Sequence, residues 1–170
     1  MKESKVEIAS IAVIWHEGIM GRNDEDVASS FIKALNSSQI CSYKNPILWL
    51  DNCAGQNKNG CLITTLEAYV NCSSYSPDTL TLKYLTKGHT YMSADYFHKQ
   101  VEEAMKRKED VEDWTDFIYC ISKAGGIPLA MDITDFKNFR SGLSHGKSLL
   151  ETKPLLENVT VAQFRKELVL

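Results

Sequence analysis

Short apolar runs alternate along this chain with stretches in which apolar residues recur at helical spacing. Such alternation of strands and helices is typical of an α/β domain in which helices cover a sheet. With 170 residues, of which 44% are hydrophobic, the chain can bury one substantial core. The strand candidates are residues 6–15, 47–50, 79–85, 127–131 and 159–164, and the helix candidates are residues 27–35, 62–71, 94–108, 111–121 and 133–139.

Composition excludes several classes of protein. The formal net charge of −3 gives no overall basic field of the kind that dedicated DNA-binding modules carry, although it leaves room for carboxylates that hold metal ions. Five widely spread cysteines, an odd number, fit a reduced intracellular compartment, nuclear or cytoplasmic. The longest apolar run is far too short for a membrane span or a signal peptide, so no membrane partner is expected.

The four apolar residues at positions 47–50 predict a buried strand, and this run ends abruptly in a polar segment. Its residues include Asp51, Asn52, Gln56, Asn57 and Lys58. In open α/β sheets, ligands bind just beyond the carboxyl ends of strands, which makes this segment a candidate site. The alternative is a turn in which the Asp51 and Asn52 side chains bond their own backbone. The sequence leaves both interpretations open.

The helix predicted at residues 94–108 carries a second candidate group. At 100° per residue, Asp95, His98 and Glu102 share one face, opposite Phe97 and Val101. A solvated charged face explains Glu102 equally well. Asp95 follows a strand end, as Asp51 does, and two such carboxylates could share divalent cations. Mg²⁺ prefers one or two carboxylates together with substrate phosphate oxygens and water.

Two other chemistries have the necessary residue types but poor spacing. A zinc site could draw on Cys53, Cys61, His89 and His98, although their spacing matches no compact zinc motif. Cys53 could act as a nucleophile with His89 as its base, without any supporting signature. The tryptophans lie inside apolar stripes and are predicted to belong to the core: Trp15, Trp49 and Trp114.

Several short motifs occur in an order that resembles a known family. They are Trp-His-Glu-Gly-Ile-Met-Gly-Arg from residue 15, Asp-Val-Ala-Ser from residue 26, Leu-Asp-Asn-Cys-Ala-Gly-Gln-Asn-Lys-Asn from residue 50, and Gly-His-Thr from residue 88, followed by Asp95, His98 and Glu102. From about residue 8 to residue 139 the chain resembles a domain of transposon-derived animal proteins that is similar to the ribonuclease-H-like cores of DDE transposases.

That resemblance implies a fold and a chemistry. The fold would be a ribonuclease-H-like mixed sheet with helices on both faces, over residues 6–140, followed by a C-terminal extension at residues 141–170. Asp51 would be the second catalytic acid and a ligand of Mg²⁺ or Mn²⁺, and DNA would be the partner. The third acid would be Asp95, also a metal ligand, or Glu102. Residues implied to contact the substrate are Asn52, Gln56, Asn57, Lys58, His89 and His98.

The chain departs from that family at its N-terminal end. A ribonuclease-H-like core begins with strands that precede the one predicted at residues 6–15, and the first of them carries an aspartate. Here no aspartate precedes Asp24. We therefore expect the first two strands and the first acid to be missing, so that the isolated chain is inactive as a nuclease. The strand at residues 6–15 would then lie at a sheet edge and favour a homodimer.

Three hypotheses remain open at this stage. The first is a transposase-derived nuclease or integrase-like domain with a partial metal site. The second is a non-catalytic domain that binds nucleic acid or a protein partner. The third is an α/β domain with neither site, in which Asp51 only holds a turn.

Overall fold

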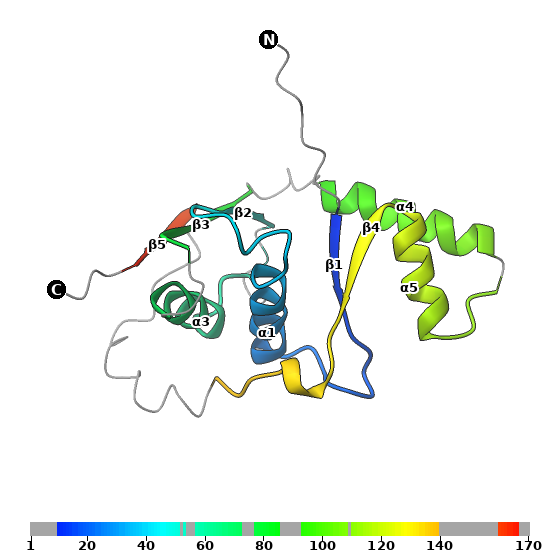
Figure 1. Ribbon diagram of the computed structural model, residues 1–170, viewed down its shortest axis with the longest axis horizontal. Coiled ribbons are helices and arrows are strands. Elements are labelled where there is room, and N and C mark those ends of the chain that lie inside the picture. Colours follow the sequence, from blue (N-terminus) through cyan, green and yellow to red (C-terminus); the bar gives the residue numbers. More distant parts are fainter. Residues whose placement is uncertain are drawn as a thin grey trace, which may run out of the picture. The chain divides into compact units, whose positions relative to one another are not determined.

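The computed structural model describes residues 10–51, 53, 57–72, 77–85, 93–108, 110–139 and 160–166 (Figure 1). The chain divides into two compact units. The smaller unit comprises Met1–Ile14 and Tyr91–Ala130, and the larger comprises Trp15–Thr90 and Met131–Leu170. Each unit is an assembly of helices and strands with its own core.

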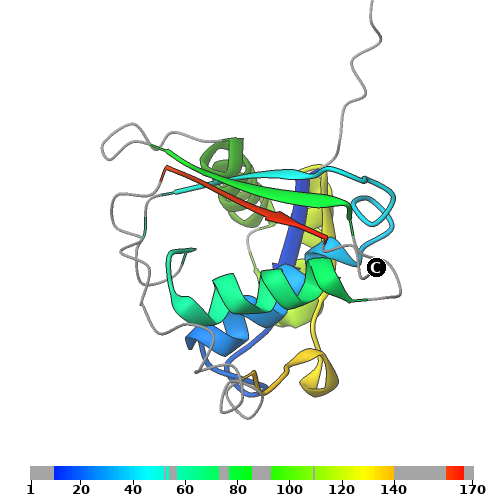
Figure 2. The ribbon, with the colours of Figure 1, turned by 90° about the vertical axis from the view of Figure 1, so that its left-hand side faces the viewer.

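The larger unit contains a three-stranded sheet with the order β2-β3-β5. β2 (Ile47–Leu50) runs parallel to β3 (Thr79–Tyr84), and β5 (Val161–Arg165) pairs with β3 in the antiparallel direction. Helices α1 (Asp24–Leu35) and α3 (Gly60–Asn71) lie on the same face of this sheet, as Figure 2 shows. A short 3-10 helix, η1 (Ile133–Asp135), is joined to α1 by an ion pair of 2.8 Å between Lys33 and Asp135.

The core of the larger unit follows from the periodicity of its elements. Leucine and valine residues four positions apart turn one side of α3 toward the sheet, and alternate residues of β3 point back at that helix. Each of these side chains is fully excluded from water: Leu62, Leu66, Val70, Leu80 and Leu82. The apolar side predicted for residues 79–85 therefore faces the core, and Thr81 on the other side is buried as well.

β2 differs from its predicted environment. Its four apolar residues were expected to be buried, but only every second one faces the core. Leu48 and Leu50 pack there, whereas Ile47 is 52% exposed and Trp49 is 54% exposed. The prediction that Trp49 belongs to the core is wrong, because a run of four apolar residues carries no alternation from which its solvent-facing side could be read.

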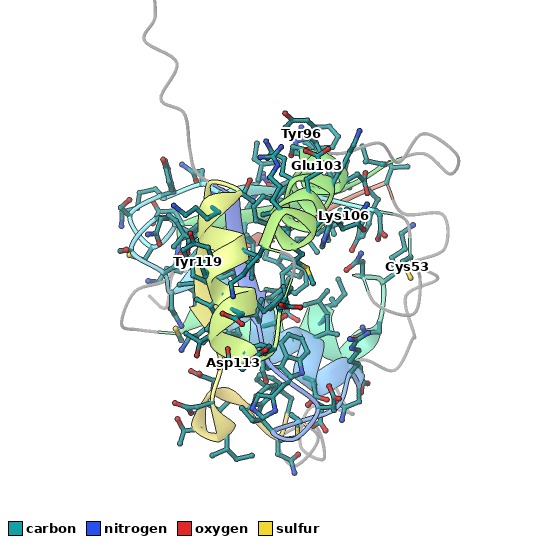
Figure 3. The ribbon with its side chains drawn as sticks, turned by 90° about the vertical axis from the view of Figure 1, so that its right-hand side faces the viewer. Cys53, Tyr96, Glu103, Lys106, Asp113 and Tyr119 are labelled. Atoms are coloured by element: carbon teal, nitrogen blue, oxygen red, sulfur yellow. The ribbon has the colours of Figure 1, made fainter. Side chains whose placement is uncertain are left out.

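The smaller unit contains a two-stranded parallel sheet, β1 (Ser10–Ile14) with β4 (Gly126–Ala130). Helices α4 (Ser93–Lys108) and α5 (Trp114–Lys123) pack with it around a small core of Phe97, Val101 and Ile121. Figure 3 shows these two helices with Glu103 and Lys106 on α4 and Tyr119 on α5.

The ends of helices lie close to where local sequence signals place them. Asn23 caps α1 by accepting from the backbone N–H of Asp26, whose carboxylate accepts from the Asn23 N–H in return. Asp113 caps α5 by accepting from the N–H of Asp116. Gly125 follows the other end of α5 with a φ of +80°, a conformation that favours glycine.

The mixed α/β class is confirmed, with strands and helices in the predicted order. The described strands form two small sheets rather than a single one. β5, which lies within the predicted C-terminal extension at residues 141–170, supplies the third strand of the larger sheet and packs Phe164 against its core. That part of the extension therefore contributes to the larger unit.

Candidate functional site

Asp51 lies directly beyond the carboxyl end of β2, and its side chain is partly exposed. Its Oδ1 atom accepts a bond of 3.2 Å from the backbone N–H of Cys53 and a second bond from the side-chain amide of Asn57. The first of these is the self-bonding turn that the sequence offered as one interpretation. Both bonds reach Oδ1, and Oδ2 accepts none from the residues that the structure describes.

The turn after β2 is fastened to the neighbouring strand by Tyr84, the last residue of β3. The Tyr84 hydroxyl donates a bond of 2.8 Å to the backbone carbonyl of Asn57. The Lys58 ammonium lies 4.7 Å from the centre of the Tyr84 ring, and the Lys58 side chain is buried. Asn59 then caps α3 by accepting from the N–H of Leu62 at 2.7 Å. Several of the polar residues after β2 therefore organise the turn itself.

Lys58 was implied to bind substrate as a surface cation. Its side chain is buried, and its ammonium lies against the Tyr84 ring. Asn57 was implied in the same role, and its side chain orients the Asp51 carboxylate. The sequence analysis missed Tyr84 as a functional residue. The alternation of Leu80, Leu82 and Tyr84 was the available signal, since it puts the Tyr84 ring on the covered face at the strand end.

Burial raises the pKa of Tyr84 above its ordinary value, because the phenolate would lose hydration. Since the folded-state pKa is the higher one, this tyrosine stabilises the fold below its ordinary pKa of about 10. That contribution is lost as the pH rises through the folded-state pKa.

Replacing Tyr84 with phenylalanine tests this fastening. Tyr84→Phe should lower the free energy of unfolding by about 1 kcal/mol, because the Asn57 carbonyl loses its donor. Above pH 10 the variant should also lose less stability than the wild-type chain, because burial opposes the ionisation of Tyr84 in the folded wild-type chain. Urea unfolding at neutral and alkaline pH measures both effects. Tyr43→Phe is the control, because Tyr43 is exposed, and an equal effect in both variants would contradict the role of Tyr84.

The second candidate group lies on α4, in the smaller unit. Asp95 is in the first turn of that helix, and Asp95, His98 and Glu102 are all exposed. Phe97 and Val101 are buried on the opposite side. The predicted division of this helix into a polar and an apolar face is confirmed. Asp51 belongs to the larger unit and Asp95 to the smaller unit.

Asn52, Gln56 and His89 lie outside the described residues. The alternative zinc site gains no support from its two described cysteines: Cys53 is exposed, and Cys61 packs in the core of the larger unit. Over the described ranges, no cluster of three or more histidine, cysteine, aspartate or glutamate side chains could hold a metal ion.

Comparison with known proteins gives one finding. Residues 26–153 match a family model described as a domain of unknown function, DUF7869. The chain belongs to this family. The DUF7869 match spans α1 through η1 and so includes both the turn at Asp51 and helix α4. No curated protein and no solved structure matches the chain. Among the described helices, none has the length and apolar character needed to cross a membrane.

Proposed function

We propose that this chain is a transposase-derived domain with part of a divalent-metal site for phosphodiester transfer, in which Asp51 is the central ligand. The position of Asp51 supports the proposal. It stands beyond the carboxyl end of β2, beside the parallel strand β3, where ligand sites of α/β sheets gather. DNA phosphodiesters are the substrate class that the resemblance implies.

The donor set at this position is compatible with Mg²⁺ or Mn²⁺. Asp51 offers a partly exposed carboxylate whose Oδ2 accepts no bond from the described residues, while Oδ1 is held by Cys53 and Asn57. Hard divalent cations take such oxygens together with water and substrate phosphate. When bound, the metal would stabilise charge on the oxygens of a phosphodiester under attack. The resemblance implies Asp95 or Glu102 as a further acid and His98 as a substrate contact, all on α4.

The role of the chain's own residues at this site is orientation. The Asn57 amide and the Cys53 N–H both donate to one carboxylate oxygen of Asp51, which leaves the other oxygen for a ligand. Tyr84 fastens the backbone of the same turn to β3. Such positioning lowers the cost of arranging a ligand at the moment of binding.

Calorimetric titration of Mn²⁺ into the full chain tests the proposal. The wild-type chain should bind saturably, and Asp51→Asn should abolish the binding. The asparagine side-chain oxygen can still accept from Cys53 and Asn57, so this change removes charge while it retains the turn.

Asp78→Asn is the matched control for this titration. Asp78 is an exposed aspartate of the same unit, but it precedes β3 and so stands at the amino end of that strand. The Asp78→Asn variant should bind Mn²⁺ as the wild-type chain does. Equal binding by Asp51→Asn and the wild-type chain would refute the metal site and leave Asp51 as a turn residue.

A non-catalytic binding domain is the second candidate function. The observation that favours it is the uncovered side of β2, where Ile47 and Trp49 are both more than half exposed. Large apolar side chains that share one exposed sheet face are typical of an interaction surface.

A further inference from the structure

The three-stranded sheet of the larger unit has a second face, opposite α1 and α3. Strand register places Trp49, Lys83 and Val161 side by side in one row across this face, with Ile47, Thr81 and Gln163 in the next row. Arg165 and Thr79 pair in a third row. We call this surface the outer face. It consists of every second residue of each strand, as the pleat of a sheet requires.

The outer face is positively charged in a chain whose net charge is negative. Its alternating positions contain Lys83 and Arg165 and no carboxylate. Among the residues that the structure describes, the carboxylates nearest in sequence, Asp51 and Asp78, lie beyond the ends of the strands. An anionic partner therefore complements this face, whereas the chain as a whole would repel one.

Both cations are held in place by neutral groups. The Lys83 ammonium lies 5.1 Å from the centre of the Trp49 ring. Arg165 donates bonds of 3.2 and 3.1 Å from Nε and Nη2 to Oε1 of Gln163. The Gln163 amide Nε2 donates to Thr81 Oγ1 at 3.1 Å. Among the described residues, neither cation forms an ion pair with a carboxylate, so the positive charge is not cancelled locally.

Trp49 gives the face its specificity for one class of anion. Its indole is 54% exposed in the same row as Lys83, with Val161, also more than half exposed, at the other end of the row. Aromatic rings on protein surfaces stack with bases that are not paired, and basic residues nearby track the phosphates. The bases of a duplex are already stacked on both sides, so this combination favours a single strand.

We propose that the outer face binds single-stranded nucleic acid, with a base stacked on Trp49 and phosphates held by Lys83 and Arg165. The incoming base displaces the Lys83 ammonium from the ring and frees it for a phosphate. This binding uses neither a metal ion nor Asp51, and it goes beyond the phosphodiester chemistry proposed above.

Fluorescence anisotropy with a labelled oligothymidylate of about 12 nucleotides tests the proposal. The full chain should bind it in a buffer containing EDTA, and a duplex of the same length should compete poorly. Trp49→Ala should weaken binding by about 5- to 150-fold, the range expected for one lost stacking contact. Lys83→Ala should weaken binding and reduce the slope of log affinity against log salt by about 0.7.

The chain provides a closely matched control on α5. Lys123 lies 5.2 Å from the centre of the Tyr119 ring, and Tyr119 is about as exposed as Trp49 (Figure 3). This second aromatic–lysine pair is part of a helix rather than a sheet face. Tyr119→Ala should bind the oligonucleotide as the wild-type chain does. Because the buffer contains EDTA, binding there separates this proposal from that of the metal site.

Three results would overturn the assignment: no binding by the wild-type chain, unchanged binding by both Trp49→Ala and Lys83→Ala, or an equal loss in Tyr119→Ala. Circular dichroism of each variant tests whether it is folded. Because Trp49→Ala and Lys83→Ala are measured separately, the assignment can still be tested if one of them does not fold. One further outcome would assign the outer face to a second copy of the chain. In that case the wild-type chain does not bind the oligonucleotide and is dimeric in light scattering, whereas Trp49→Ala is monomeric.

Discussion

Leu82→Ala should lower the free energy of unfolding of the larger unit by about 2 to 5 kcal/mol. Leu82 is fully buried in the middle strand of the three-stranded sheet, paired in register with Leu48 of β2 and Ala162 of β5. The truncation removes buried methyl groups and leaves a cavity that neighbours on both flanking strands would have to fill. Because the sheet constrains those neighbours, little relaxation is expected.

Urea unfolding followed by far-ultraviolet circular dichroism measures this loss. A decrease of about 3 kcal/mol would lower the midpoint by roughly 1.5 M if the slope is about 2 kcal/mol per molar urea. Ile47→Ala is the matched control, since Ile47 is an aliphatic residue of the same sheet on the outer face. It should change stability by less than about 0.5 kcal/mol. Similar losses in the two variants would contradict the assignment of the two faces.

Gly126→Ala should destabilise the smaller unit by about 1 to 3 kcal/mol. A methyl group at Gly126 would lie 2.4 Å from Cζ and 2.7 Å from Cε2 of the Phe97 ring, and 3.1 Å from Cγ2 of Ile121. Phe97 and Ile121 are both buried in the core of this unit, so core side chains must shift to make room for the methyl group. The strain should displace α4 from β4.

Hydrogen exchange resolves this effect by unit, because faster exchange is expected in β4, α4 and α5 while the larger unit keeps its protection. Gly60→Ala is the control: no atom lies within 4 Å of a methyl group at that position, and alanine suits the start of α3. Its stability should be unchanged or slightly higher. Phe97→Leu should partly rescue Gly126→Ala by removing the tip of the ring, and a fully additive loss would argue against the clash.

The presence of α5 could be predicted from the sequence, whereas the buried side of β2 could not, and this difference has a physical reason. Residues 110–126 contain a capping aspartate, a stripe of apolar residues and a glycine with positive φ, each of which acts on its own backbone. The start and end of α5 could therefore be predicted locally. For β2, four consecutive apolar residues are compatible with either face being covered. Only its packing partners decide that Leu48 faces the core and Trp49 faces outward.

At the candidate site, too, the local features could be predicted from the sequence, whereas a contact between distant residues could not. The sequence predicted a strand, a polar turn and a helix around Asp51, and it offered a self-bonded turn as one interpretation. The structure adds the bond from Asn57 to the carboxylate and the fastening of the turn by Tyr84 from the neighbouring strand. The second of these joins the turn after β2 to the end of β3, so no local pattern contains it. The role of Asp51 toward a metal ion is still a proposal.

The sequence by itself determined the order of strands and helices and the polar and apolar faces of α4. These features depend on hydrogen bonds and periodicities within a few residues. Tertiary structure alone decided that the strands divide into two sheets, that β5 joins β3, and that Trp49, Lys83 and Arg165 share one exposed surface. Pairing of strands distant in sequence depends on which apolar surfaces can be buried together, and that choice involves the whole chain.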